Sequence, residues 1–189
     1  MKRIFVLSGA LLILCGSVHD AAAATEWSVG EGGNGHLYEV VLVTEGILWD
    51  DARAAAEAAG GYLAVVTSQA ENDFIFSLAD PIADLWDGSG INTLGPWLGG
   101  YQQESDGQWA WVTGEAFAYT NWGYHQPNGN GDYLNIYGLG SIHGADWNDY
   151  DDPLKGYVIE YVPEPATTAL LALGGVFALR RRQTGRAHV

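Results

Sequence analysis

The chain has 189 residues and a formal net charge of −15, and six of its eight Lys and Arg residues lie near its two ends. Residues 25–162 hold two basic residues against 21 acidic ones, a formal charge of −19. Such an acidic surface repels phosphate groups, which makes nucleic acid and anionic lipid poor partners of this region. Metal cations and neutral ligands remain, although acidity also simply keeps an exported protein soluble.

The first 24 residues have the pattern of a secretory signal peptide. Lys2 and Arg3 precede an apolar run over residues 4–14, and the four alanines of residues 21–24 suit a cleavage site. A retained membrane anchor is the alternative, but the run is shorter than the roughly 20 residues that span a bilayer. The only cysteine, Cys15, lies in this segment, so the mature chain is expected to have no disulfide.

A linker over residues 25–35 is predicted to lead into one domain over residues 36–161. Its first half reads strand, helix, strand, helix. The first helix is rich in alanine and ends at the glycine pair of residues 60–61, as a helix C-terminus often does. The second helix begins at Ser68, because Ser68 and Glu71 have the spacing of a capping box.

After Pro81 the chain changes to short strands and turns. Five aromatic or alternating runs are bounded by Gly, Asn or Asp, and they cover residues 96–103, 108–115, 133–138, 145–149 and 155–161. Two helices followed by short strands predict an α+β domain. Most of the Trp residues in periodic segments are predicted to be core, namely Trp49, Trp97, Trp109, Trp111 and Trp147.

A polar loop, residues 121–133, interrupts this aromatic region. It reads NWGYHQPNGNGDY, and its glycines, asparagines and proline forbid a helix or a central strand. Gln126 and Asn128 from this loop, with Asn148 and Asp149 from a later strand, offer the side-chain oxygens that Ca²⁺ accepts. The alternatives are that the loop residues are turn formers, that Asn148 and Asp149 only end a strand, and that the acidic run 149–152 is a solvated rim.

The last 28 residues, 162–189, form a segment of three parts. Pro163, Glu164 and Pro165 are followed by an apolar run over residues 166–179 and by three arginines, Arg180, Arg181 and Arg182. Fourteen helical residues reach about 21 Å, a marginal transmembrane helix whose cationic end should stay cytoplasmic. This order resembles the PEP-CTERM sorting signal of Gram-negative bacteria, although a plain tail anchor is an alternative.

The PEP-CTERM resemblance implies a partner and a destination. A membrane transpeptidase, the exosortase, would process the chain near Glu164. The chain would be anchored transiently in the inner membrane and delivered to the cell surface or the extracellular matrix of a Gram-negative bacterium.

The domain resembles the C-type lectin-like domain across residues 36–161. The resemblance is carried in order by the WDDARAAAEAAGGYLAVVTSQAENDF stretch, by WLGGYQQ and QWAWVTGE, by the QPN of the loop, and by WND and YVIEY. It implies an α+β lectin-like fold of two helices and short antiparallel strands with a long loop region and no disulfides. Tyr133 and Ile159 stand where the family commonly has cysteines, and both are expected to fill core volume instead.

The resemblance also implies a site. It carries calcium ligands over to Gln126, Asn128, Asn148 and Asp149, with a cis Pro127 holding the first pair. The family's glutamate before the next strand is replaced by Gly131, with Asp132 as a shorter substitute. Gln-Pro-Asn is a hybrid of the family's mannose-type and galactose-type loops. With so few anionic ligands, we expect a calcium affinity of about 10⁻⁴ to 10⁻³ M.

The expected function is a secreted, calcium-dependent, non-catalytic carbohydrate-binding module for a neutral saccharide or exopolysaccharide. The sugar-binding residues would be Gln126, Asn128 and Asn148, with Trp122 and Tyr150 as aromatic platforms. The alternative is a lectin-like fold that serves as a structural or protein-binding matrix component without sugar or calcium. A glycoside hydrolase is disfavoured because nothing in the sequence pairs two carboxylates across a cleft.

Overall fold

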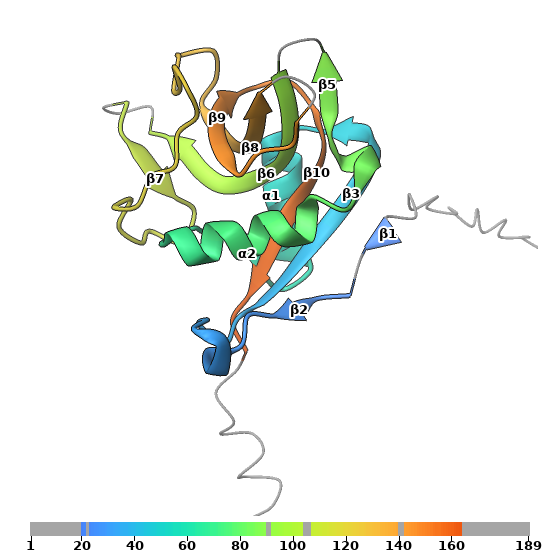
Figure 1. Cartoon of the computed structure of the whole chain (residues 1–189), viewed down its shortest axis with the longest axis vertical. Helices are drawn as coiled ribbons and strands as arrows, with labels where there is room; N and C mark the ends of the chain where they lie inside the picture. Colours follow the sequence, from blue (N-terminus) through green and yellow to red (C-terminus); the bar gives the residue numbers. More distant parts are fainter. Residues whose placement is uncertain (1–19, 22, 90–91, 104–106, 140–141, 164–189) are drawn as a thin grey trace, which may run out of the picture.

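The computed structural model describes residues 20–21, 23–89, 92–103, 107–139 and 142–163, and Figure 1 shows the arrangement of its elements. The α-helices are α1 (Trp49–Ala58) and α2 (Gln69–Ala79), and the 3₁₀ helices are η1 (Val29–Glu31) and η2 (Ala83–Leu85). The strands are β1 (Asp20–Ala21), β2 (Thr25–Glu26), β3 (Leu37–Ile47), β4 (Tyr62–Leu63), β5 (Asp87–Ser89), β6 (Asn92–Gln102), β7 (Trp109–Trp111), β8 (Tyr133–Leu139), β9 (Asp146–Tyr150) and β10 (Leu154–Tyr161).

The end of α1 and the start of α2 lie where the sequence predicts them. α1 stops just before Gly60, whose φ of 88° is a left-handed conformation that glycine adopts without strain. α2 begins after Ser68, whose Oγ accepts a hydrogen bond from the backbone N–H of Glu71 at 3.2 Å. The side chain of Glu71 does not complete a capping box. Its carboxylate accepts hydrogen bonds from Thr67 and Tyr38 and not from the backbone N–H of Ser68.

One mixed sheet forms the centre of the domain, in the order β1-β3-β10-β6-β8-β9. β10 runs antiparallel to β3 and parallel to β6, while β6, β8 and β9 are successively antiparallel. β9 therefore lies at one end of this order, next to β8. The confirmed α+β architecture places the long loop between β7 and β8 close to that end.

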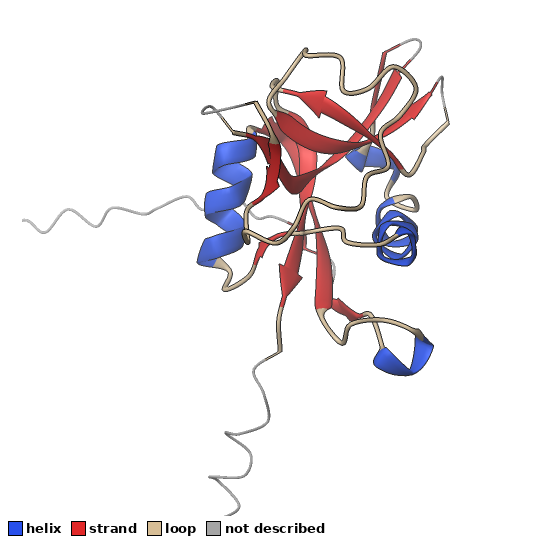
Figure 2. Cartoon of the chain, turned by 90° about the vertical axis from the view of Figure 1, so that its left-hand side faces the viewer, coloured by secondary structure: helices blue, strands red, loops and turns tan. Residues whose placement is uncertain are grey.

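The two helices cover opposite sides of the sheet (Figure 2). α1 packs its buried Trp49 in a cluster with Trp97 and Ile159, and α2 packs Ile75 in a second cluster with Trp111 and Trp147. Four of the five tryptophans predicted as core are buried, whereas Trp109 is only partly buried.

The positions that lack the family's cysteines are filled by packing. Ile159 is 2% exposed, and the partly buried Tyr133 stacks on Trp49 with ring centroids 4.5 Å apart. Both side chains therefore occupy core volume as expected. Because Cys15 is the only cysteine of the chain, no disulfide can form within it.

Residues 25–35, expected as a linker, carry β2 and η1 and contact a buried polar network. Asn34 donates to the Glu71 carboxylate at 3.1 Å, and His36 Nδ1 lies 2.6 Å from the Glu160 carboxylate. Burial raises the pKa of Glu160 above its usual range, and burial with the nearby Glu160 charge does the same to the pKa of Tyr38.

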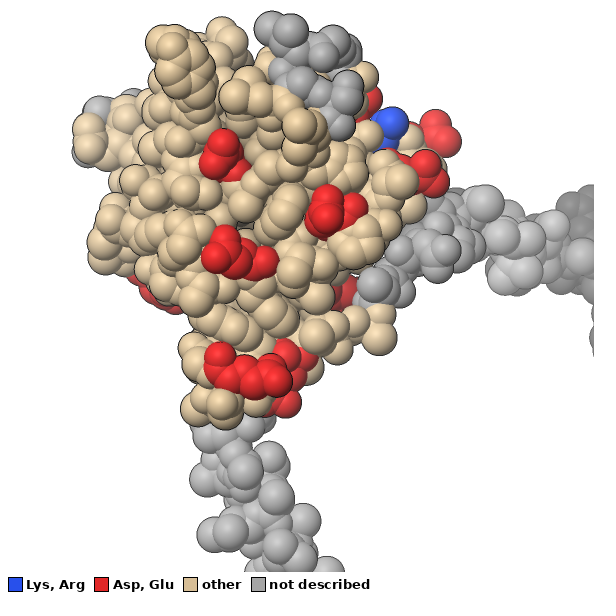
Figure 3. Space-filling view, viewed as in Figure 1, with Lys and Arg blue, Asp and Glu red and all other residues tan. Residues whose placement is uncertain are grey.

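Acidic side chains are scattered over the face drawn in Figure 3, and basic surface is seen only near its upper right edge. Part of the signal-peptide prediction concerns described residues, since Asp20 and Ala21 pair with Leu42 and Val41 of β3. Residues 1–19 and residue 22 of that segment, and the sorting segment after Pro163, lie outside the described residues. Within the part that the structure describes, no helix is long and apolar enough to cross a membrane.

Candidate functional site

The loop between β7 and β8 runs along β9. The backbone of Trp147 donates to Asn121 O at 2.8 Å and accepts from Gly123 N at 2.9 Å. Further along, Asp132 N donates to the Asp151 carboxylate at 2.8 Å. The loop is therefore held by the backbone of β9 at one end and by the side chain of Asp151, just after β9, at the other.

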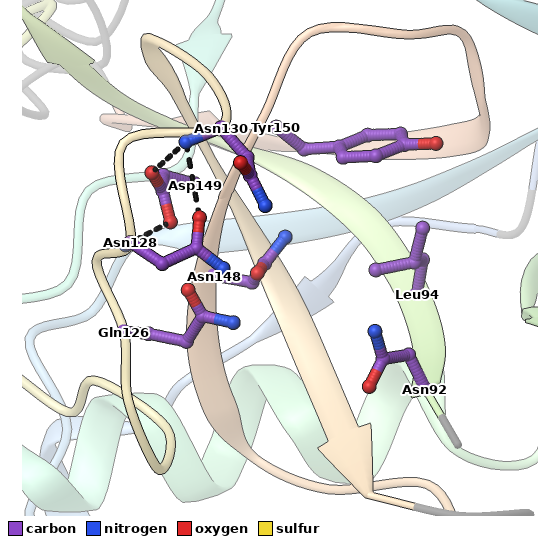
Figure 4. Close-up of a pocket in the computed structure, with 8 residues that line it drawn as sticks. All are labelled: Asn92, Leu94, Gln126, Asn128, Asn130, Asn148, Asp149 and Tyr150. Carbon is purple, nitrogen blue, oxygen red and sulfur yellow. Dashed lines mark hydrogen bonds between the residues drawn. The ribbon is translucent and has the colours of Figure 1, made fainter.

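A pocket of about 160 Å³ lies between this loop, β9 and β6. It is lined by Asn92, Leu94, Gln126, Asn128, Asn130, Asn148, Asp149 and Tyr150. Five of these eight side chains are carboxamides, and one is a carboxylate. Figure 4 shows the loop residues Gln126, Asn128 and Asn130 facing the β9 residues, with Asn92 and Leu94 across from them on β6.

Gln126, which lines this pocket, carries an unpaired acceptor. Its Oε1 is buried and has no hydrogen-bond partner within the described structure, and the Gln126–Pro127 peptide bond is cis, as the resemblance implies. A buried carbonyl oxygen without a donor is costly, so such atoms commonly await a ligand, ion or water. Gln126 Oε1 is therefore the atom of the pocket that most clearly lacks a partner.

Asn148 is held by a buried amide beneath it. Its Nδ2 donates to Asn135 Oδ1 at 3.0 Å, and Asn135 in turn donates to Ile136 O at 2.7 Å. Asn135 is fully buried and Asn148 is 5% exposed. Because the amide nitrogen of Asn148 is used below the pocket, its carbonyl oxygen is left for the pocket.

Asp149 uses its carboxylate on the loop backbone. Oδ1 accepts from Asn128 N at 2.9 Å, and Oδ2 accepts from Gly129 N at 2.7 Å and from Asn130 N at 3.0 Å. Asp149 is 1% exposed, so its charge is compensated by these three donors in a buried position. Each carboxylate oxygen can accept two hydrogen bonds, which leaves one acceptor position on Oδ1.

The predicted site residues separate into two groups. Gln126, Asn128, Asn148, Asp149 and Tyr150 all line the pocket. Asp132 and Trp122 do not. Asp132 is exposed, and Trp122 packs edge-on against Trp109 and Trp147 in the aromatic core.

The position of Gly131 leaves no room for a glutamate. A Cβ at this residue would lie 2.3 Å from the carbonyl carbon of Tyr150, so the backbones of the loop and β9 are in direct contact there. The family's acidic ligand therefore cannot be restored by a side chain at residue 131 without moving the loop.

A calcium ion needs six to eight oxygens, so the donor set can be tested directly. The pocket offers the unpaired Gln126 Oε1, the Asn148 carbonyl oxygen, Asn128 Oδ1, which accepts one bond from Asn130 N, and the remaining position on Asp149. These four hard oxygen donors carry one formal charge, so they fit calcium only as part of its coordination, with water or ligand oxygens for the rest, and they predict weak binding. Among the described residues, no three His, Cys, Asp or Glu side chains come together as a metal cluster.

Residues that were not predicted complete the pocket. Asn92 and Leu94 come from β6, and Asn130 comes from the loop. Asn135 orients Asn148 from below. The signal for Asn135 was available in the sequence, because it is a polar residue at the centre of the otherwise apolar strand YLNIYG.

Comparisons with known proteins find relatives of moderate sequence identity. Over 146 residues, covering 68% of this chain, the chain is 29% identical to halomucin of Haloquadratum walsbyi, of which it spans only 1%. It is 30% identical over 106 residues to a perlucin-like protein of Mytilus galloprovincialis, covering 56% of this chain and 63% of that one. It is 30% identical over 130 residues to lithostathine-1 of Mus musculus, covering 66% and 74% of the two chains.

Solved structures show the same fold. Human lithostathine superposes with a TM-score of 0.55 at 22% identity over 68% of this chain and 84% of that one. The Ca²⁺-independent C-type lectin SPL-2 of Saxidomus purpuratus gives a TM-score of 0.54 at 20% identity, over 70% and 90% of the two chains.

The profile of the PEP-CTERM protein-sorting motif matches residues 162–183, which implies an exported, surface-sorted protein. The profile of the lectin C-type domain matches residues 45–159, and the chain therefore belongs to the C-type lectin domain family.

Proposed function

We propose that this domain is a non-catalytic carbohydrate-binding module for a neutral saccharide, with Ca²⁺ as a weakly bound cofactor. The observation that carries the proposal is the buried, unpaired Gln126 Oε1 in a pocket lined by four further carboxamides. A hydroxyl group or a cation would give this oxygen its missing partner.

Carboxamides suit the recognition of sugar hydroxyls. Each carboxamide offers a donor and an acceptor on one rigid plane, and each hydroxyl needs both. Tyr150 adds an aromatic wall, and burial with the nearby Asp152 charge raises the pKa of its hydroxyl, which hydrogen-bonds to Asp152. The pocket combines apolar and polar contacts as saccharide sites commonly do.

Calcium would be held by Gln126, Asn128, Asn148 and Asp149. When bound there, the ion would supply open coordination positions to two neighbouring hydroxyls of the sugar. The residues themselves orient the oxygens: Asn135 fixes Asn148, and Asp149 fixes the backbone around Asn128.

Charge supports a neutral ligand and a non-catalytic role. No Lys, Arg or His is found among the described lining residues, so an anionic sugar would lack a counter-charge in this acidic domain. Glycoside hydrolysis generally uses two carboxylic groups that flank the scissile bond, and Asp149 is the single carboxylate of the lining.

The test is retention of the full-length protein on an array of neutral glycans in millimolar calcium and in chelator. We expect binding that weakens in chelator, with a melting temperature that rises on adding calcium because the ion binds the folded state. Asn148→Ala should abolish retention. Asn121→Ala is the matched control, because Asn121 also donates one side-chain bond, to Ala145 O, but does not line the pocket.

A second candidate is a lectin-like structural or protein-binding component of the matrix, without sugar or calcium. It is favoured by one observation: the one carboxylate among the described lining residues already has three backbone donors. The similarity to SPL-2, a lectin described as Ca²⁺-independent, also favours a domain that does not need calcium. Absence of both glycan retention and a calcium-induced shift would select this candidate.

We also infer that residues 162–189 direct surface sorting in a Gram-negative bacterium. Exosortase would process the chain near Glu164 while the apolar run is transiently anchored in the inner membrane with Arg180, Arg181 and Arg182 on the cytoplasmic side. Glu164→Ala should leave an unprocessed precursor in the membrane fraction. Thr184→Ala, which lies beyond the matched residues 162–183, should be processed normally.

A further inference from the structure

Three consecutive backbone amides of the loop converge on one carboxylate. The N–H groups of Asn128, Gly129 and Asn130 all donate to Asp149, at 2.7 to 3.0 Å. Successive amides can point at one anion only if the backbone alternates its handedness, and the φ of Gly129 is +76°. Residues 128–130 thus form an anion-binding turn, and its anion comes from the same chain.

The contacts around this turn come from alternate residues of one chain segment. Trp147 pairs with the loop through its backbone, Asp149 through its carboxylate, and Asp151 accepts from Asp132 N at 2.8 Å. Asp149 lies in β9 and Asp151 follows the end of that strand, and both carboxylates accept hydrogen bonds from backbone N–H groups of the loop. Gly131 packs directly on the Tyr150 backbone between them.

We propose that Asp149 closes the loop over residues 128–130 as an internal anion, so that the pocket is formed before any cation binds. In this role Asp149 is a positioning residue, and it acts through the loop on Gln126 and Asn128. The proposal takes its ligand from the proposed function, but the closure itself depends only on the contacts between β9 and the loop.

The electrostatic argument is that no charge is left uncompensated when the cation is absent. Where carboxylates gather around an ion, removing the ion leaves like charges that repel and open the site. This pocket has a single carboxylate, and three charge-assisted hydrogen bonds already compensate it. Removing calcium therefore creates no repulsion between carboxylates that would open the loop.

The experiment is amide hydrogen exchange of the full-length protein, in millimolar calcium and in chelator. In chelator we expect the amides of residues 128–130 to exchange at least about tenfold more slowly than in an unstructured chain, because exchange requires the loop to open. Adding calcium should change these rates by less than about twofold. Amides that are unprotected in chelator and become protected only in calcium would overturn the proposal.

Two variants separate closure by Asp149 from general stability. Asp149→Asn should release the amides of residues 128–130 while the strands β3 and β10 keep their protection. Asp151→Asn is the matched control, since its carboxylate accepts only from Asp132 N and its loss should release that amide alone. Protection of residues 128–130 that survives in Asp149→Asn would also contradict the proposal. If Asp149→Asn does not fold, the comparison of the unmodified protein in calcium and in chelator decides by itself.

Failure of this proposal differs from failure of the proposed function. Amides protected in chelator without any glycan retention would leave the closed loop standing and remove the carbohydrate function. Glycan retention in calcium, with amides that are unprotected in chelator, would leave the carbohydrate function standing and remove the closed loop.

Discussion

Asn148 donates its side-chain amide to Asn135 Oδ1 at 3.0 Å, and Asn135 has no exposed surface. The pair is also a cross-strand pair of β9 and β8. A polar residue in the centre of the sheet thus fixes the orientation of a residue in the pocket. The carbonyl oxygen of Asn148 is available to a ligand because its nitrogen is occupied below.

Asn135→Ala should weaken glycan and calcium binding by about tenfold, because the Asn148 amide loses its acceptor and can rotate. The free energy of unfolding should also fall by about 1 to 3 kcal/mol, since a buried donor is left unpaired. Both quantities can be measured by titration and by chemical denaturation. Asn121→Ala should lose stability without losing affinity, and equal affinity in the two variants would contradict the role of Asn135.

Gly129 and Gly131 of the loop should respond differently to alanine. At Gly129 a Cβ meets nothing within 4 Å, so Gly129→Ala should cost only the left-handed backbone strain of about 1 to 2 kcal/mol. At Gly131 a Cβ would meet the Tyr150 backbone at 2.3 Å, so Gly131→Ala should push the loop off β9. Glycan affinity should therefore fall far more in Gly131→Ala than in Gly129→Ala, as measured on the same array.

The same contact predicts that Gly131→Glu does not raise calcium affinity, although it restores the residue type that the family resemblance implies. A calorimetric calcium titration measures this directly. Tighter binding would mean that the loop can move away from Tyr150 at little cost.

Most of the fold could be predicted from the sequence because its signals are local. The alanine-rich run, the glycines after it and the Ser68 cap fix both helices, and each signal acts within a few residues. Alternating aromatic runs likewise predict the strands. Gln126, Asn128, Asn148 and Asp149 could be brought to one pocket only through the family resemblance, since the pocket joins segments far apart in the chain.

The remaining features depend on strand register and packing, which no local pattern contains. Asn92 and Leu94 reach the pocket because β6 pairs with β8 in a specific register. Trp122 looks like a sugar platform in the sequence, but in the structure it lies in the aromatic core beside Trp147. The use of the Asp149 carboxylate on three backbone amides is likewise invisible in the sequence.

Tyr150 and Trp122 should therefore have separate effects. Tyr150→Ala removes a wall of the pocket and should lower glycan affinity by about tenfold, in the range expected for an aromatic contact. Trp122→Ala should instead lower the free energy of unfolding, by up to about 3 kcal/mol, because the side chain packs on Trp109 and Trp147. Denaturation and array binding, measured on both variants, check this. A larger loss of affinity in Trp122→Ala would place the sugar platform in the loop after all.

The buried carboxyl of Glu160 gives the domain a predicted pH dependence. Glu160 is 3% exposed and accepts from Val65 N at 3.0 Å, and burial raises its pKa above the usual 4.5. The folded protein therefore holds this proton more tightly than the unfolded chain does. The resulting stabilisation is complete below pH 4.5 and is lost as the pH rises through the raised pKa.

Glu160→Gln should remove this pH-dependent loss of stability, because the amide keeps an acceptor for Val65 N but has no charge to bury. Relative to the unmodified protein, its free energy of unfolding should rise as the pH increases from 4.5 towards neutrality. Guanidinium denaturation at several pH values measures the difference. Glu57→Gln, at an exposed ion pair with Arg53, should show a difference that is nearly independent of pH. A stability difference for Glu160→Gln that shrinks towards neutral pH would mean that the pairing with His36, and not burial, dominates this carboxyl.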